Sequence, residues 1–173
     1  RNGPFHFTHS KVMCWVALDR AARLGERGEL PSRCVDRWRR EAAAIRAFVE
    51  TECWSSELRS YTRIAGSRDV DASLLMMPLM RFDDPHGERM QGTIDAVRRL
   101  LQRGDFVYRY HADDGIAGGE GCFVNGSFWL VQASHVSLGG QAWGVKGWLI
   151  VAAWTVAMSL LAARAYARDT QRV

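Results

Sequence analysis

The sequence predicts an all-α protein built as an array of helical hairpins. Two observations predict this fold class. Apolar residues recur at spacings of three and four in several successive segments, which is the period of an amphipathic helix. The segments are joined by loops that carry glycine, aspartate and aromatic residues, and no rhythm of alternating strands and helices indicates a parallel sheet.

The first two helices are predicted by clear apolar stripes. One begins near Thr8, with Thr8 or Ser10 as N-cap and Gly25 or Gly28 as its end. Its apolar positions are Val12, Met13, Val16, Ala17 and Ala21. The other follows Pro31, with Ser32 as the N-cap candidate. Its stripe is made of Val35, Trp38, Ala42, Ile45 and Val49.

The middle of the chain alternates short elements with loops. The stretch WSSELRSYTRIAGS, from Trp54 onward, predicts a turn or a short strand. Asp71 is expected to cap a short apolar helix, DASLLMMPLM, and RFDDPHG reads as a loop. A helix over about residues 91–103 buries Ile94, Val97 and Leu101, and Gly104 ends it. DFVYRYH then alternates like a strand, and a last helix follows from Phe123 to the glycine pair 139–140.

Residues 147–163 carry no charge, whereas Lys146 precedes them and three arginines follow. Seventeen uncharged positions are at the short limit for crossing a bilayer, so this segment predicts either a membrane-spanning helix or a buried helix that closes a core. Possible membrane contact through residues 147–163 is therefore one expectation. The chain is otherwise 47% hydrophobic and 24% charged, which is ordinary for a globular protein.

The charge balance argues against nucleic-acid binding. The net charge is +4, and residues 144–173 alone contribute +3 of it, from Lys146 and three arginines against Asp169. The rest of the chain is nearly neutral, without the basic stripe that binds phosphates. No nucleic-acid partner is expected.

The four cysteines predict neither a zinc site nor a redox pair. Cys14, Cys34, Cys53 and Cys122 form no CxxC spacing, and we expect buried free thiols in a reducing cytoplasm. No secretory signal is visible, and the chain begins RNGPF without methionine, so its true start is expected to lie upstream. No metal or other cofactor is expected. The loop aspartates that could bind calcium are more often solvated or capping: Asp83, Asp84, Asp113 and Asp114.

The strongest chemical signal is GIAGGEGCF, residues 115–123, where Glu120 stands among four glycines. Glycine lets the backbone turn freely and lets a ligand come close, so this carboxylate is placed to take a proton from water; the alternative is a solvated loop residue. Aromatic and charged residues surround it: Tyr108, Arg109, Tyr110, Phe123, Phe128 and Trp129. Such a mixture suits a sugar, because rings stack on its C–H faces and charged groups bond its hydroxyls.

Tyr108 and Tyr110 share one face of the expected strand and Arg109 takes the other. All three side chains therefore cannot enter one cleft, and one tyrosine is as well explained by core packing.

Several motifs in order resemble glycoside hydrolase family 15: HFTHSKVMCWVALDRAARL, VDASLL, FVYRY and DDGIAGGEGCF followed by SFWLV, over about residues 1–132. The resemblance implies a partial (α/α)6 barrel, a ring of helical hairpins, and inverting hydrolysis of α-glucosidic bonds as in glucoamylases and bacterial trehalases. It implies that Glu120 is the general base and that Arg109 and Tyr110 contact substrate. His9, Lys11 and Trp15 follow from the HFTHSK segment as lining residues, and Trp129 completes the set.

The resemblance also places the general acid in a Trp-Glu motif just upstream of HFTHSK. This chain begins at Arg1, after that position, and contains no Trp-Glu pair. Several hairpins of the ring would be missing as well. We therefore expect the chain alone to be inactive or nearly so, since general acid catalysis is worth about 10²–10⁴-fold.

The tail departs from the family pattern. Residues 148–173 resemble the last helix and tail of ABC-2 type export permeases, where Tyr166, Arg168, Asp169 and Thr170 match a familiar ending. This suggests two joined coding pieces meeting near residues 134–143, or else a divergent last helix. We expect a partial catalytic domain at 1–138 and an apolar helix with a basic tail at 144–173. Two other hypotheses stay open: a carbohydrate-binding remnant without catalysis, and a membrane-tethered fragment.

Overall fold

The computed structural model describes residues 5–111, 122–139, 149–150, 152–160 and 164 of the chain. The chain forms two compact units, Arg1–Gly140 and Gln141–Val173. In the first unit the described part is mostly helical, with two small hairpins of two-residue strands, so the prediction of an all-α class is confirmed.

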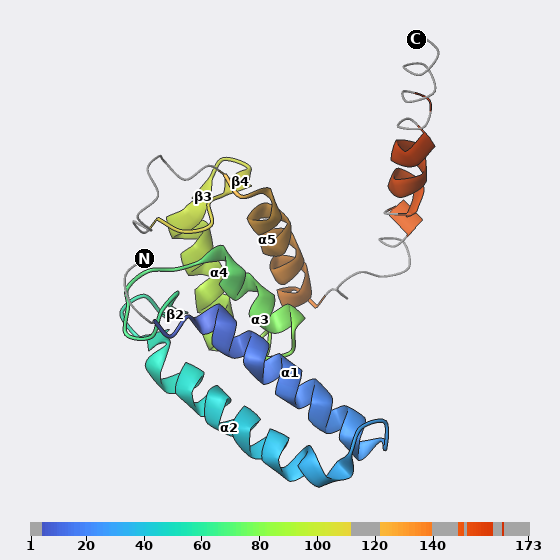
Figure 1. Ribbon diagram of the computed structural model, residues 1–173. Coiled ribbons are helices and arrows are strands. Elements are labelled where there is room, and N and C mark those ends of the chain that lie inside the picture. Colours follow the sequence, from blue (N-terminus) through green and yellow to red (C-terminus); the bar gives the residue numbers. More distant parts are fainter. Residues whose placement is uncertain (1–4, 112–121, 140–148, 151, 161–163, 165–173) are drawn as a thin grey trace. The chain divides into compact units, whose positions relative to one another are not determined.

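Helices α1 (Thr8–Glu26) and α2 (Val35–Glu52) form an antiparallel hairpin, joined through the 3-10 turn η1 (Ser32–Cys34) (Figure 1). The two helices pack on each other and bury Val12, Val16 and Val49, whereas Met13 and Ala17 of the predicted α1 stripe are exposed. The predicted N-caps were wrong. Phe7 and Cys34 occupy these positions without side-chain capping bonds, because the Thr8 hydroxyl instead donates to the carbonyl of Thr62, at 2.5 Å.

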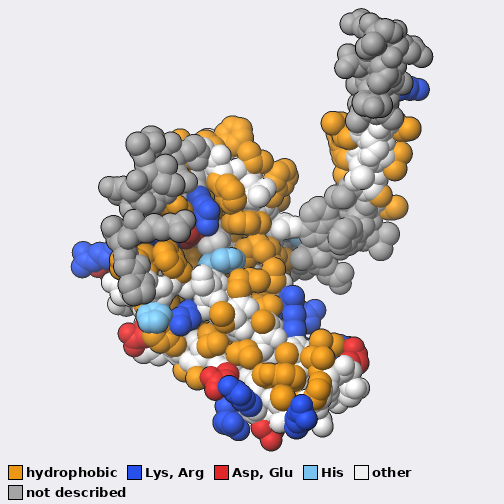
Figure 2. All heavy atoms as spheres, viewed as in Figure 1, with side chains coloured by type: hydrophobic (Ala, Val, Ile, Leu, Met, Phe, Trp, Pro, Cys, Tyr) orange, Lys and Arg blue, Asp and Glu red, His pale blue; other side chains and the backbone are white. Residues whose placement is uncertain are grey.

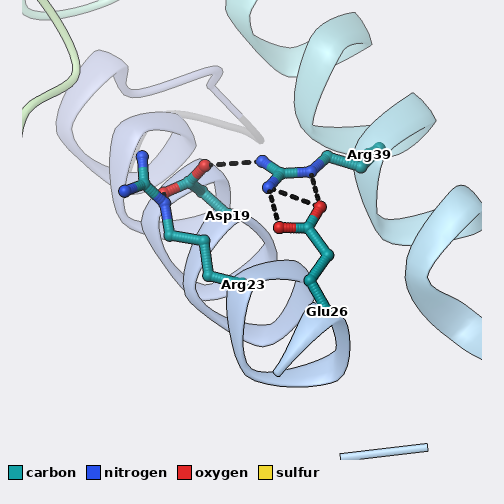
Figure 3. Close-up of polar contacts among 4 residues, drawn as sticks. All are labelled: Asp19, Arg23, Glu26 and Arg39. Carbon is teal, nitrogen blue, oxygen red and sulfur yellow. Dashed lines mark hydrogen bonds and ion pairs between the residues drawn. The ribbon is translucent and has the colours of Figure 1, made fainter. Parts of the chain in front are cut away.

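A network of ion pairs joins the two helices near their connecting turn (Figure 3). Asp19, whose side chain is only 13% exposed, accepts hydrogen bonds from Arg23 at 2.8 Å and from Arg39 at 2.9 Å. Arg39 extends from α2 and also contacts both carboxylate oxygens of Glu26. The hydrogen bonds to Glu26 raise the pKa of the Arg39 guanidinium, which therefore stays charged.

The segment after α2 forms the predicted short strands. Strand β1 (Trp54–Ser55) pairs antiparallel with β2 (Ser60–Tyr61). Tyr61 is 1% exposed, and its hydroxyl donates to Asp83 Oδ2 at 2.8 Å. Asp83 and Asp84 also accept backbone hydrogen bonds within their own loop, so these two carboxylates act as loop caps.

The short apolar helix lies at the centre of the first unit. Asp71 accepts from the backbone N–H of Ser73 at 2.7 Å and caps η2 (Ala72–Leu75), as predicted. Helix α3 (Met76–Leu79) continues from η2. Because η2 contacts α1, α3, α4 and α5, its side chains are almost fully buried and form the middle of the core.

Helices α4 (Glu88–Leu101) and α5 (Val124–Ser137) complete the first unit (Figure 1). Between them, β3 (Gln102–Arg103) pairs with β4 (Phe106–Val107) through a turn in which Gly104 has φ +58. Gly104 therefore lies in the turn between β3 and β4, and Gln102, not Gly104, is the C-cap of α4. The predicted strand over 105–111 is confined to Phe106 and Val107.

The surface of the first unit mixes charges of both signs over α1 and α2, and apolar side chains show over α5 (Figure 2). The α5 side chains Val124, Phe128 and Val131 are more than half exposed. The expectation of four buried thiols was wrong for three of them, because Cys14 and Cys122 are exposed and Cys34 is partly exposed. Cys53 is buried, and burial raises the pKa of its thiol.

The second unit is helical at its described residues, 149–150, 152–160 and 164. Its apolar side chains are exposed, Trp154 to 65% and Leu149 to 62%. Within the described residues, every helix is too short or too polar to cross a membrane. The expected membrane contact of residues 147–163 is therefore not supported.

We predict that Asp19→Asn lowers the free energy of unfolding by about 2 kcal/mol, because it weakens hydrogen bonds to two arginines at a largely buried position. The matched change Glu26→Gln, at a side chain that is 47% exposed, should cost less than about 1 kcal/mol. Urea denaturation of the two variants and the native chain measures both values. Equal losses would show that burial does not set the strength of this network.

We also predict that stability falls at high pH through Tyr61. Burial, and next the charge of Asp83, raise the pKa of this phenol above its ordinary value of 10.0. The folded state therefore favours the neutral phenol, and this contribution is complete below pH 10.0 and is lost as the pH rises toward the folded pKa. The free energy of unfolding, measured by denaturation between pH 8 and 11, should fall more steeply with pH for the native chain than for Tyr61→Phe. Parallel pH profiles would contradict this assignment.

Candidate active site

Two of the predicted substrate contacts lie together just after β4. The guanidinium carbon of Arg109 is 5.5 Å from the ring centroid of Tyr110 and 5.7 Å from that of Phe123. The Phe123 ring in turn meets the Trp129 indole edge to face, with centroids 5.3 Å apart. Tyr110, Arg109, Phe123 and Trp129 thus form one continuous series of contacts, the aromatic array.

This arrangement corrects the expectation that Arg109 and Tyr110 lie on opposite faces of a strand. Strand β4 ends at Val107, so strict alternation does not continue through residues 108–110. The carbonyl of Arg109 instead accepts from the N–H of Ala72 at 2.8 Å, which ties this segment to η2. Tyr108 lies apart from the array, against the ring of His111 at 5.2 Å.

Both stems of the glycine-rich loop are fixed beside the array. Tyr108 and Cys122 form an antiparallel bridge, and the N–H of Phe123 donates to the carbonyl of Val107 at 3.0 Å. A hydrogen bond with Cys122 raises the pKa of the Tyr108 phenol, which is therefore neutral at pH 7. The backbone on either side of residues 112–121 is thereby clamped. Glu120, Asp113 and Asp114 fall outside the described residues.

Helix α5 carries the other side of the array. The N–H of Val107 donates to the Ser127 hydroxyl at 3.0 Å, which joins β4 to the first turn of the helix. Gly126 packs on Val107 and Ala72 so closely that an added Cβ would lie 3.2 Å from the side chain of Ala72. The absence of a side chain at Gly126 therefore lets α5 approach η2, and this sets the position of Phe123 and Trp129.

The three predicted lining residues of α1 lie in other surroundings. Lys11 points its ammonium at the Phe48 ring, 5.4 Å from the centroid, and His9 is half-buried in the first turn. Trp15 is 7% exposed, packs edge to face on Phe82, and lies under the guanidinium of Arg46 at 4.7 Å. Trp15 is thus a core residue of the described unit, and substrate contact by these three side chains stays a prediction.

No motif in the sequence indicated Arg63 as part of this site. Its guanidinium carbon lies 5.0 Å from the centroid of the Tyr110 ring, on which Arg109 also lies. A single arginine in an unremarkable loop carries no motif, and only the folded chain brings residues 63 and 110 together. No group of three or more His, Cys, Asp or Glu side chains suited to a metal ion occurs among the described residues.

Comparison with known proteins agrees with the motifs. The family model of glycosyl hydrolases family 15 matches residues 1–173. The trehalase of Mycobacterium tuberculosis is 43% identical over 136 residues, and that of Mycolicibacterium smegmatis is 42% identical over 140. Each match covers 77% of this chain and 20% of the relative, so the chain spans about a fifth of the length of these curated relatives.

Among solved structures, a glycosidase variant in complex with glucose is similar at a TM-score of 0.68 and 20% identity. The match covers 77% of this chain and 34% of the glycosidase, and the helical arrangement corresponds to part of the six-hairpin (α/α)6 fold. The family match includes residues 144–173. The expected similarity of this tail to export permeases is therefore not confirmed.

We predict that Phe123→Leu lowers the free energy of unfolding by about 1 kcal/mol, because it removes the ring that joins Arg109 to Trp129. The matched change Phe128→Leu, on the same helix at a side chain that is 65% exposed, should stay within about 0.5 kcal/mol of the native value. Thermal or urea unfolding measures both. A larger loss at Phe128 would mean that the array is not a stabilising contact.

Proposed function

This chain belongs to glycosyl hydrolase family 15, and we propose that it forms part of an α-glucoside hydrolase in which Glu120 is the general base. The single observation that carries the proposal is the clamped stem of the glycine-rich loop beside the aromatic array. A loop held at both ends can present the Glu120 carboxylate next to rings and a guanidinium suited to a sugar.

Each side chain has a role in the proposed reaction. The Glu120 carboxylate takes a proton from a water molecule, which attacks the anomeric carbon on the face opposite the departing oxygen, so that the configuration inverts. The Tyr110 and Trp129 rings stack on the C–H face of the glucose unit, and Arg109 donates hydrogen bonds to its hydroxyls. His9, Lys11 and Trp15 are proposed as more distant lining residues on the family resemblance alone.

The proposed substrate follows from the relatives. Those named above are trehalases, so trehalose is the first α-glucoside to test. A solved neighbour of the same fold holds glucose, which makes glucose the natural probe for a single subsite. Maltose and isomaltose serve as comparison substrates, because they present the same glucose unit through different linkages.

We propose that these 173 residues alone hydrolyse such bonds poorly. The inverting reaction also needs an acid that protonates the departing oxygen. The sequence contains no Trp-Glu pair, and five of the described glutamates form ion pairs with arginines: Glu26, Glu29, Glu50, Glu57 and Glu88. Without an acid the rate falls about 10²–10⁴-fold.

The test uses the chain and a chimera in which it replaces the 136 aligned residues of the Mycobacterium tuberculosis trehalase. We expect the chimera to release glucose from trehalose, and Glu120→Gln to lower this rate at least about 10²-fold. Glu88→Gln, the same change at a side chain that is 85% exposed, should leave the rate unchanged. NMR of the fresh products reports their anomeric configuration: inversion should give one β-glucose from the attacked unit for each α-glucose that departs.

Three results would contradict parts of this proposal. Full activity of Glu120→Gln would remove the assignment of the base. Strong trehalose hydrolysis by the 173 residues alone would remove the claim that they lack an acid. Glucose binding without turnover in the chimera would favour a carbohydrate-binding role in place of a hydrolytic one.

A further inference from the structure

The guanidinium of Arg63 lies between two aromatic rings from distant parts of the chain. Its central carbon is 5.0 Å from the centroid of Tyr110 and 5.7 Å from that of Phe7. Phe7 precedes α1, whereas Tyr110 follows β4 and leads into the glycine-rich loop. Arg63 therefore joins the N-terminal segment to the segment that carries the proposed substrate contacts.

The backbone of Arg63 is fixed independently of its side chain. Its carbonyl accepts from the N–H of Thr8 at 3.0 Å, and its own N–H donates to the carbonyl of Asp69 at 2.7 Å. The neighbouring residue Ile64 forms an antiparallel bridge with Phe7. The side chain thus starts from a held position, so that it can in turn restrain the ring it touches.

Ion pairing alone does not account for the placement of this guanidinium. The side chain is only 13% exposed, yet its carboxylate partner Asp69 is 50% exposed and lies 3.6 Å away. Its Nε is buried without a hydrogen-bond partner among the described residues. The Phe7 and Tyr110 rings supply contacts that the ion pair does not, and a planar guanidinium is favoured against such rings over the compact ammonium of lysine.

We propose that Arg63 is a positioning residue, which holds the Tyr110 ring in place against Arg109 for contact with the glucose unit. This inference rests on the proposed function. Arg63 acts through Tyr110 and does not itself touch the sugar. With Arg63 on the Tyr110 ring at 5.0 Å and Arg109 at 5.5 Å, two cations restrain one aromatic side chain.

The experiment compares three single variants of the 173-residue chain. Arg63→Met removes the charge, and Arg63→Lys keeps the charge and the approach to Asp69 but loses the planar face. Arg68→Met is the matched control, because Arg68 is in the same loop, 79% exposed and paired with Glu57. Thermal unfolding confirms that each variant is folded, and NMR of ring-labelled tyrosine follows Tyr110 directly.

We expect Arg63→Met and Arg63→Lys to shift or broaden the Tyr110 ring signals and to raise the Kd for glucose about five-fold. Arg68→Met should leave both unchanged. In a Tyr110→Ala background, Arg63→Met should change the Kd less than two-fold, because the effect is transmitted by the missing ring. Recovery of native Kd and Tyr110 signals in Arg63→Lys would overturn the inference in favour of a simple ion pair.

Other outcomes separate this inference from the proposed function. Unchanged Tyr110 signals in Arg63→Met would overturn the inference whatever the Kd. Altered Tyr110 signals with a native Kd would show that Arg63 holds the ring without affecting glucose binding. This result would also overturn the inference. If the native chain fails to bind glucose, the proposed sugar site fails, and with it the role of Arg63 in that site.

Discussion

The pairing of the segment before α1 with residues 62–64 is the constraint on which the rest of the first unit depends. Thr8 is fully buried, and its N–H and hydroxyl both bond to carbonyls of that segment, those of Arg63 and Thr62. Phe7 adds the bridge to Ile64. Because buried backbone groups are costly when unpaired, these bonds fix where α1 begins and hold Arg63 against Tyr110.

The same logic governs the glycine-rich loop. The bridge between Tyr108 and Cys122 and the bond from Phe123 to Val107 fix the backbone that enters and leaves it. The array of Arg109, Phe123 and Trp129 stands at the exit of the loop, on elements packed against the central turn η2. Binding residues are often carried by loops that leave such a rigid base.

Expectations from the sequence succeeded where the cause is local. The helical period of α2 and the cap at Asp71 depend on residues within one or two turns, and both were found. The N-cap at Thr8 failed, because its hydroxyl bonds to Thr62 across the fold. The alternation of Tyr108 and Arg109 failed, because pairing of β4 stops at Val107.

The sequence by itself determined the helical class and the family, and it indicated Glu120 as the candidate base. Helical periodicity and contiguous motifs depend only on residues that are neighbours in the chain. Only the tertiary structure decided that Arg109 meets Phe123, that Trp15 is buried in the core and that Arg63 reaches the Tyr110 ring. The physical reason is that these contacts join segments far apart in the chain, whose approach is set by packing around η2 and by the backbone bonds of Thr8.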